Sequence, residues 1–271
     1  MTNEASQLAR FLSRSERIAV ITGAGVSTVS GIPDYRDEHG EWKRPEPIRH
    51  QLFMGDERAR RRYWSRSMHG FRFMARARPN AAHRALAALE QGGRLRGIVT
   101  QNVDRLHQKA GSRGVVDLHG RIDRVECMGC GRVTSRRLLQ EELEKRNGLA
   151  TRHVEVAPDG DADIESFDLD TFEVPDCAIC GGILKPAVTF FGGTVPATTH
   201  RAAEAIIDEA DALLVVGTSL MVFSAYRLAR RAAGRGIPIA AVNRGRTRAD
   251  DLIATKVEAC CVDTLPGVTP G

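Results

Sequence analysis

Four cysteines in this chain have the spacing of a metal site. Cys127 and Cys130 form one C-x-x-C pair and Cys177 and Cys180 form another, and a glycine follows each pair. This spacing lets both sulfur atoms of a pair reach one ion from a tight turn, and the glycine lets the backbone fold back toward the thiolates. Two such pairs complete the closed tetrahedral site of a structural zinc ion, which leaves no position for substrate.

The four cysteines have an alternative explanation, and their spacing departs from the standard zinc pattern in one respect. Two disulfides or unrelated thiols would also use four cysteines, although a duplicated C-x-x-C-G pattern is unlikely to arise by accident. The segment between the pairs, residues 131–176, is longer than the roughly 15–20 residues of a standard zinc ribbon. We predict one structural zinc ion that marks a subdomain, so the reactive groups must be sought elsewhere in the chain.

Small or polar residues follow four short apolar runs. The runs are residues 18–22, 97–100, 212–216 and 238–242, and they read as buried strands. In a parallel sheet, ligands bind beyond the carboxyl ends of the strands. The segments at these ends are therefore candidates for one shared ligand site: Gly23, Ala24, Gly25 and Ser27; Gln101, Asn102 and Asp104; Gly217, Thr218 and Ser219; and Asn243, Arg244 and Gly245.

The first of these segments resembles a phosphate-binding turn only in part. Gly23 and Gly25 would allow a phosphate to approach the backbone, and a following helix N-terminus would add amide donors. Thr28 stands where the third glycine of the G-x-G-x-x-G pattern belongs, and a tight structural turn explains the glycines about as well. Asn243 replaces the acid that often binds ribose in such sheets, so a ribose contact there would be a neutral hydrogen bond.

Two further segments could act on a ligand. In the turn of residues 31–36, Pro33 fixes the backbone and Asp34 and Arg36 place opposite charges two residues apart, so the turn could cover a ligand. His119 stands between an apolar run and Gly120. A lone histidine is more often a core or surface residue than a catalyst, but its pKa range suits a general base near neutral pH.

The order of the elements indicates an α/β fold. Helical patterns at 7–14, 56–76, 80–90, 199–210 and 223–233 alternate with the strands, and Asn80 is a candidate N-cap. This alternation predicts a Rossmann-like parallel sheet with helices on both faces.

Composition narrows the function classes. The 271 residues are 42% hydrophobic, and none of the apolar runs reaches the roughly 18 residues of a membrane span. We see no basic or apolar leader at the start, so we expect a cytoplasmic protein with reduced thiols. The net charge is +5, and arginines are concentrated at 58–78. A solvated helix face explains them better than nucleic-acid binding, because no recognition motif accompanies them.

Read in order, these segments resemble the sirtuin family of NAD-dependent protein deacylases. The matching pieces are residues 23–27, 31–36, 100–107 and 118–120, the two cysteine pairs, and residues 185–192, 216–220 and 242–245. The chain is most similar to the class II branch, in which a long spacer between the cysteine pairs is expected. Tyr35 stands where many sirtuins have phenylalanine.

The resemblance implies a large domain from residues 1–40, 79–120 and 183–271, and a small domain from a helical insertion at 41–78 and a zinc module at 121–182. It implies that Cys127, Cys130, Cys177 and Cys180 hold zinc, that His119 is the general base, and that Gln101, Asn102 and Asp104 position the nicotinamide and its ribose. The remaining NAD contacts would come from the strand-end segments named above together with Asp34, Tyr35, Arg36 and Cys261.

The implied reaction consumes NAD as a co-substrate. The carbonyl oxygen of an acyl-lysine attacks the ribose carbon, nicotinamide leaves, His119 deprotonates a ribose hydroxyl, and lysine and O-acyl-ADP-ribose are released. The partners would be acyl-lysine proteins or peptides. Two alternatives remain: a mono-ADP-ribosyltransferase that uses the same NAD site, and a non-enzymatic zinc protein that binds nucleic acid.

One pair of residues bears on the acyl group. Tyr63 and Arg66 lie one helical turn apart, a spacing that class III sirtuins use to bind acidic acyl groups, and arginine can hold a carboxylate with two hydrogen bonds. The simpler interpretation is that Arg66 is one more arginine on a basic helix.

Overall fold

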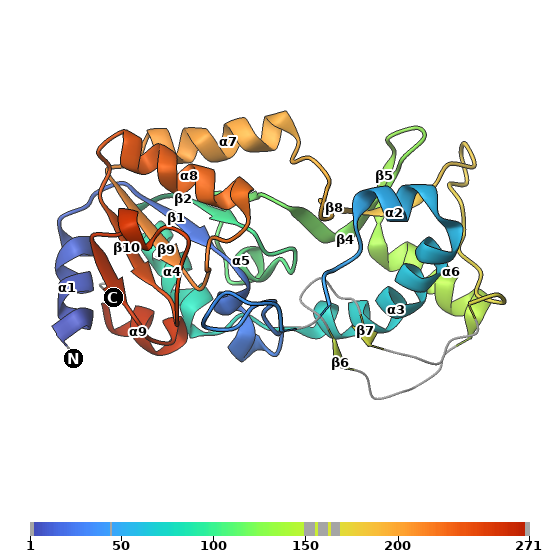
Figure 1. The fold of residues 1–271 in the computed structure, drawn as a ribbon, viewed down its shortest axis with the longest axis horizontal. Helices are drawn as coiled ribbons and strands as arrows, with labels where there is room; N and C mark the ends of the chain where they lie inside the picture. The colour runs from blue at the N-terminus through green and yellow to red at the C-terminus, as the bar shows by residue number, and fades with distance from the viewer. Residues whose placement is uncertain (1–2, 44, 149–154, 157–161, 164–168, 269–271) are drawn as a thin grey trace.

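The computed structural model describes residues 3–43, 45–148, 155–156, 162–163 and 169–268. The chain forms two parts that lie side by side (Figure 1): a large part built on a parallel sheet, and a smaller part that contains α2, α3 and α6 and the hairpin of β4 and β5. The chain crosses between them several times, so each part is assembled from segments distant in sequence.

The large part is built on six parallel strands in the order β3-β2-β1-β9-β10-β11. From β1 the chain builds outward through β2 to β3, and it later returns to place β9 on the other side of β1. This is the strand order of a dinucleotide-binding fold, with the reversal between β1 and β9. The strands are β1 (Ile18–Thr22), β2 (Leu95–Thr100), β3 (Val115–Asp117), β9 (Ala212–Val216), β10 (Ile239–Val242) and β11 (Thr255–Val257).

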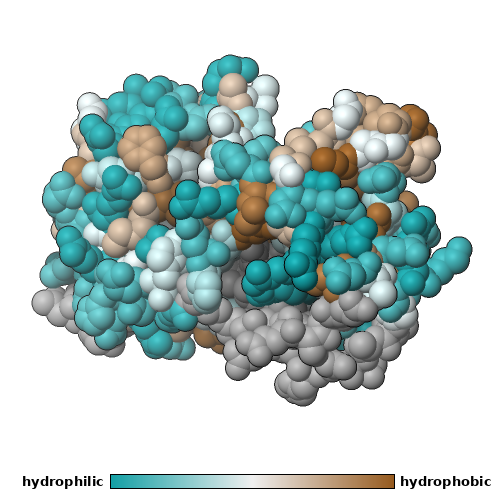
Figure 2. All heavy atoms as spheres, turned by 45° about the vertical axis from the view of Figure 1, so that its right-hand side comes forward, coloured by the Kyte–Doolittle hydropathy of each residue, from teal (hydrophilic) through white to brown (hydrophobic). Residues whose placement is uncertain are grey.

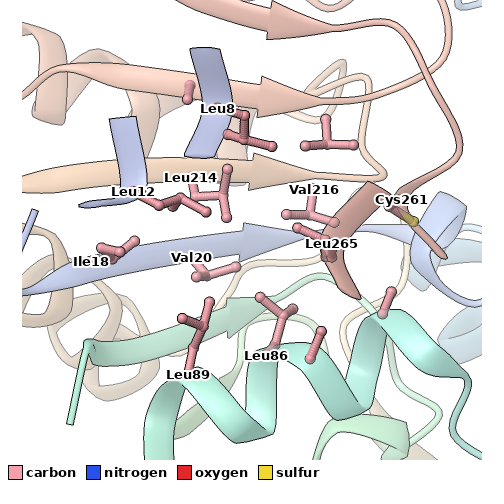
Figure 3. Packing of buried hydrophobic residues seen from close by; sticks show 14 of the residues in the cluster. Leu8, Leu12, Ile18, Val20, Leu86, Leu89, Leu214, Val216, Cys261 and Leu265 are labelled. Atoms are coloured by element: carbon pink, nitrogen blue, oxygen red, sulfur yellow. The ribbon is translucent and has the colours of Figure 1, made fainter. Parts of the chain in front are cut away.

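Helices cover both faces of this sheet, as predicted. Every residue of β1 is buried, since alternate side chains enter two different cores. Ile18 and Val20 face α1 (Asn3–Ser13), α4 (Ala81–Gln91) and α9 (Cys261–Val268). Ala19 and Ile21 face α7 (Ala197–Asp208) and α8 (Phe223–Gly234). Figure 3 shows the first core, in which Leu86 and Leu89 of α4 point toward β1.

Asn80 is the N-cap of α4, as its position in the sequence indicates. Its side chain accepts hydrogen bonds from the backbone amides of Ala82 and His83, which would otherwise lack partners in the first turn. Its Nδ2 also donates to the carbonyl oxygen of Val26 at 2.8 Å. The cap therefore ties α4 to the segment that follows β1.

The smaller part has its own apolar core. It contains α2 (His50–Gly55), α3 (Glu57–Arg76), α6 (Arg136–Asn147) and an antiparallel sheet of β5 (Val133–Ser135), β4 (Gly120–Cys127) and β8 (Leu184–Val188). Phe53, Trp64, Val125 and Leu143 are completely buried at its centre. A short pair, β6 (Glu155–Val156) with β7 (Ala162–Asp163), lies beside α3.

A charged side chain is buried in this core. Arg136 at the start of α6 has no exposed surface, and its guanidinium lies 4.4 Å from the ring centroid of Phe71 and 5.2 Å from that of Trp64. Burial lowers the pKa of Arg136 to about 10, so the group stays charged at neutral pH. The ring faces stabilise the cation electrostatically, and Ser67 accepts a hydrogen bond from it.

The predicted α/β fold is confirmed, but the helix N-terminus that would add amide donors to a phosphate-binding turn is not present after Gly25. No α-helix follows Gly25: the chain forms two three-residue 3₁₀ turns, η1 (Ala24–Val26) and η2 (Thr28–Ser30). Asn80 holds the Val26 carbonyl, and Gly31 at φ 89° reverses the chain, so a continuous helix is interrupted. Of residues 159–176, a stretch rich in acidic side chains, eight lie outside the described residues, and the domain boundaries stay a prediction. In the described chain no helix has the length and apolar character needed to cross a bilayer.

Candidate active site

A cavity of about 1250 Å³ opens at the carboxyl ends of β1, β2, β9 and β10. It lies at the strand-order reversal, and the segment between β8 and α7 forms its opposite wall. Figure 2 shows the molecule hollowed between its two parts, with both hydrophilic and hydrophobic residues beside the hollow. The predicted residues that line the cavity are Gly23, Ala24, Gly25, Asp34, Tyr35, Arg36, Gln101, Asn102, His119, Gly217, Thr218, Ser219, Asn243, Arg244 and Cys261.

Gln101 connects three strand ends. It follows β2, its Nε2 donates to Thr218 Oγ1 at 2.7 Å and to the Thr22 carbonyl oxygen at 3.3 Å, and its own carbonyl oxygen lies 3.2 Å from His119 Nδ1. One side chain and one carbonyl thus hold the ends of β1 and β9 and the ring of His119 in a fixed relation.

Asn102, Ser27 and Asp104 form a second connection. Asn102 Nδ2 donates to the Gly23 carbonyl oxygen and to Ser27 Oγ, both at 3.0 Å, and Ser27 Oγ donates to Asp104 Oδ2 at 2.7 Å. Burial raises the pKa of Asp104, and hydrogen bonds from the Leu106 amide and Ser27 oppose that shift. Asn102 lines the cavity, whereas Ser27 and Asp104 lie behind its wall. The predicted direct NAD contacts of Ser27 and Asp104 are therefore not supported. Instead, Asp104 binds Ser27, and Ser27 binds Asn102, which lines the cavity.

His119 lies at the junction of the two parts, between β3 and β4. Gly120 follows it at φ 82°, and the His119 carbonyl oxygen accepts a hydrogen bond from the Thr189 amide beyond β8 at 2.8 Å. Burial lowers the pKa of His119 to about 4, against the opposing effect of the Gln101 carbonyl. The imidazole is therefore neutral near pH 7, which is the state that can accept a proton.

The glycines of the first and third strand ends pack against each other. The Gly25 amide donates to the Gly217 carbonyl oxygen at 2.8 Å, and a Cβ on Gly25 would lie 2.9 Å from that oxygen. A Cβ on Gly23 would lie 2.6 Å from Thr218 Cβ. These glycines therefore let two loops meet beneath the ligand site. This agrees with the interpretation that a tight structural turn, rather than phosphate binding, requires them.

Replacement of Gly217 by alanine should damage both the fold and the cavity. Gly217 has φ 57°, and a Cβ there would overlap Val26 N and lie 2.7 Å from Gly25 C. We expect a loss of about 1–3 kcal/mol in the free energy of unfolding, measured by denaturant titration, together with weaker NAD binding. Gly234→Ala is the control, because a Cβ there meets nothing within 4 Å. Equal stability of the two variants would contradict the prediction.

Residues 34–43 form one wall of the cavity. The Arg36 guanidinium lies 3.9 Å from the ring centroid of Trp42 and donates to the Gly40 carbonyl oxygen at 2.6 Å. Asp34 accepts a hydrogen bond from Lys43 at 2.7 Å. Tyr35 makes an edge contact with Trp42. The two predicted charges, Asp34 and Arg36, are thus held by the loop itself, at the cavity surface.

The predicted NAD contacts after β10 and at Cys261 are only partly supported. Asn243 and Arg244, after β10, line the cavity, whereas Gly245 packs on the Glu38 backbone outside it. Cys261 Sγ lies 3.7 Å from the Gly25 carbonyl oxygen, and burial raises its pKa to about 12, so it is a neutral thiol. A direct role for Gly245 is not supported.

Tyr63 and Arg66 do not line the cavity. Tyr63 is 3% exposed, and its ring lies 5.4 Å from Phe53 and 5.1 Å from Phe190, measured between centroids. Phe190 does line the cavity, so Tyr63 stands one layer behind it. The predicted contact of these two side chains with an acyl group is not supported, because the inward face of α3 is used for core packing.

Several residues of the cavity were not predicted. Ser224 in the first turn of α8 lies 2.8 Å from His119 Nε2. His200 on α7 lines the cavity with Nδ1 3.3 Å from Glu204, and its Nε2 is buried without a hydrogen-bond partner in the described chain. A single sequence carries no signal for these residues, since they come from helices whose register against the sheet is set by packing.

The four predicted metal ligands come together away from this cavity. Their sulfur atoms all lie within 4.8 Å of one another, with Cys127 and Cys180 at 3.4 Å and Cys130 and Cys177 at 3.9 Å. Tetrahedral zinc with Zn–S bonds of about 2.3 Å separates its sulfurs by about 3.8 Å, so the cluster fits zinc. The Gly129 amide, inside the first pair, points to Cys127 Sγ at 3.4 Å. Gly131, the glycine that follows this pair, has φ 71° and donates its amide to the Cys127 carbonyl oxygen at 2.9 Å.

Two buried histidines beneath the site predict an acid-sensitive fold. His107 Nε2 lies 2.9 Å from Thr22 Oγ1, and the His83 and His107 rings are 4.8 Å apart. Burial lowers the pKa of His83 to about 4, with Arg84 contributing, and burial and then His83 lower the pKa of His107 well below its usual value.

In the unfolded chain both histidines titrate near 6.5, so from pH 6.5 down toward 4 the unfolded state binds protons that the folded state does not. The free energy of unfolding should therefore fall across this window by about 3 kcal/mol for His83 alone, as measured by denaturant titration at pH 7 and 4. His83→Gln should be less stable at pH 7 but show a shallower pH dependence. An identical pH dependence in the variant would refute this origin.

Comparison with known proteins agrees with this geometry. The Sir2 family model matches residues 23–224. A protein of Bradyrhizobium diazoefficiens named NAD-dependent protein deacetylase 2 is 56% identical over 94% of this chain and 94% of its own length. One from Bordetella pertussis, named NAD-dependent protein deacetylase, is 56% identical over 96% of this chain and 95% of its own.

Solved structures show the same fold. One described as "Structural Basis for the Mechanism and Regulation of Sir2 Enzymes" has a TM-score of 0.79 and 32% identity, and the match covers 99% of this chain and 97% of that one. Another, "Sir2-p53 peptide-NAD+", has a TM-score of 0.74 and 29% identity, with coverage of 99% and 97%.

The Rossmann-like sheet with a cavity at its strand-order reversal, together with a four-cysteine cluster that fits zinc, defines a dinucleotide-binding class of protein with a structural metal site. The chain belongs to the Sir2 family.

Proposed function

We propose that this chain is an NAD-dependent protein-lysine deacetylase that releases nicotinamide and O-acyl-ADP-ribose. One observation carries the proposal: a neutral histidine, His119, faces a dinucleotide-sized cavity with Nδ1 held by the Gln101 carbonyl, so that Nε2 is directed to accept a proton. The names of the relatives support the same activity.

The residues of the cavity fit NAD as a co-substrate. Asn102, Thr218 and Asn243 offer neutral polar groups along the strand ends, and Arg36 and Arg244 supply positive charge at the same surface. NAD would supply the electrophilic ribose carbon whose bond to nicotinamide is broken. His119 would take a ribose hydroxyl proton at Nε2, and Asn102 and Gln101 would keep the strand ends at fixed positions around that ribose.

Apolar side chains would protect this reaction from water. Val103, Val188 and Phe190 line the cavity between the two parts of the molecule. Their walls exclude water from an electron-poor ribose centre, where hydrolysis would compete with acyl transfer. Zinc, held by Cys127, Cys130, Cys177 and Cys180, would brace the smaller part and take no part in the chemistry.

The same walls bear on the acyl group. Because Val103, Val188 and Phe190 are apolar and Arg66 does not line the cavity, we propose that the acyl chain is small and neutral. The kinetic comparison is between acetyl-lysine and succinyl-lysine peptides, repeated with Arg66→Met. A preference for succinyl-lysine that disappears in Arg66→Met would overturn this proposal and restore the acidic acyl group.

The test of function is product analysis. The protein is incubated with NAD and a panel of acyl-lysine peptides, and every product is identified by mass. Free nicotinamide, deacylated peptide and O-acyl-ADP-ribose in equal amounts are expected. A peptide that gains ADP-ribose would favour a mono-ADP-ribosyltransferase instead. Salt-dependent DNA binding with no release of nicotinamide would favour the non-enzymatic alternative.

A further inference from the structure

Ser224 contacts the imidazole of His119 directly. It lies in the first turn of α8, and its Oγ is 2.8 Å from His119 Nε2. On the other side of the ring, Nδ1 is 3.2 Å from the Gln101 carbonyl oxygen. In the described part of the chain, Ser224 is the only side chain that hydrogen-bonds this ring, and it lines the same cavity.

These two contacts select one protonation state of the ring. A carbonyl oxygen can only accept, so Nδ1 must carry the hydrogen, and Nε2 of the neutral ring then presents a lone pair. The Ser224 hydroxyl therefore donates to Nε2. A hydroxyl can also accept, so after Nε2 has taken a proton the same oxygen can receive the N–H of the imidazolium.

We propose that Ser224 is a positioning residue for the general base. In the free protein its hydroxyl donates to the single lone pair of Nε2 and holds the His119 ring with Nε2 at the cavity. When NAD is bound, the ribose hydroxyl takes that lone pair in place of Ser224 and gives its proton to Nε2, and the Ser224 oxygen can then accept the N–H of the imidazolium. This inference rests on the proposed function, since it assumes that His119 acts as the base. The sequence does not indicate Ser224, because the contact depends on where α8 begins relative to β3.

The titratable side chains near His119 do not orient its ring, which leaves that role to Ser224. Burial lowers the pKa of His119 and the Gln101 carbonyl opposes this shift, with no contribution from a charged neighbour. The titratable groups of the adjacent helices that line the cavity face Glu204: His200 Nδ1 of α7 lies 3.3 Å from it, and Arg227 of α8 forms an ion pair with it at 3.7 Å. A carboxylate that could orient the base is therefore replaced here by a carbonyl on one nitrogen and a hydroxyl on the other.

The test combines ring spectroscopy with kinetics. Protein labelled with ¹⁵N-histidine is studied at pH 7, and the His119 ring signals are assigned by their absence in His119→Asn. Ser224→Ala removes the hydroxyl, Ser224→Thr retains it, and Ser13→Ala is the matched control. Ser13 donates to the Arg10 carbonyl oxygen on α1, away from the cavity.

We expect the Nε2 resonance to move in Ser224→Ala to the position of a nitrogen without a hydrogen bond, while Nδ1 stays protonated. The kcat for deacetylation should fall about three- to tenfold, the effect of one neutral hydrogen bond, with the KM for NAD almost unchanged. Ser224→Thr should restore most of the rate, and Ser13→Ala should behave as the parent protein.

Two results would overturn the assignment. An unchanged Nε2 resonance in Ser224→Ala would show that the hydroxyl does not hold the ring. ADP-ribose attached to Ser224, found by peptide mass analysis of turned-over protein, would make it a nucleophile rather than a positioning residue. If the parent protein deacetylates no peptide, the proposed function fails, but the ring spectra still decide whether Ser224 binds His119.

Discussion

Replacement of His119 by alanine is expected to lower kcat about 10²–10⁴-fold, the usual contribution of a positioned general base, with NAD binding retained. The retained binding follows from the geometry, since the contacts of Gln101 with Thr218 and of Asn102 with Gly23 hold the strand ends without the imidazole. The measurement is steady-state deacetylation together with NAD affinity by calorimetry.

His69→Ala is the matched control, because His69 lies on α3 outside the cavity. It removes the same side chain without touching the proposed base. A correctly folded His119→Ala protein with near-normal turnover would exclude His119 as the base. Loss of NAD binding in parallel with turnover would instead mean that the ring shapes the cavity.

Replacement of Cys177 by serine is expected to remove zinc and loosen the smaller part of the molecule. Cys177 is buried, and Cys127 at the end of β4 is one of its partners in the cluster. Structural zinc in small modules contributes about 10–16 kcal/mol of apparent binding free energy that is available only in the folded state. The zinc content should fall from one ion per chain to almost none, and deacetylation should be lost.

The larger core should survive this loss. Its two clusters pack on the six-stranded sheet and include none of the four cysteines. Hydrogen exchange should therefore increase in β4 and β8 first, and a chelator added to the parent protein should reproduce the pattern. Cys260→Ser is the control, because Cys260 lies outside the cluster and should leave one zinc per chain. Normal zinc content in Cys177→Ser would refute the four-ligand site.

Much of the fold follows from local pattern. The strands at 18–22 and 212–216 appear in the structure at the predicted residues, because continuous β-branched and aliphatic runs can be buried only in a sheet covered on both faces. Asn80 caps its helix as predicted, because an N-cap depends only on one side chain and on the backbone amides of the next few residues. The four sulfur atoms come together as predicted, because each short C-x-x-C turn fixes the relative position of its own two sulfurs.

Other features depend on contacts between distant segments. The chain after Gly25 forms 3₁₀ turns, and Asn80, far along the chain, binds the Val26 carbonyl oxygen there. Asp104 has the residue type of a ligand contact, but the fold turns it inward to accept from Ser27.

The sequence by itself determined which residue types the protein has for chemistry and the strand ends that carry them, because short-range patterns control strands, caps and metal knuckles. Only the tertiary structure decided which of those side chains face the cavity and which stand behind it. Ser224 reaches His119, while Tyr63 is covered by Phe190, because the register of packed helices against a sheet is set by the fit of whole faces rather than by any local spacing.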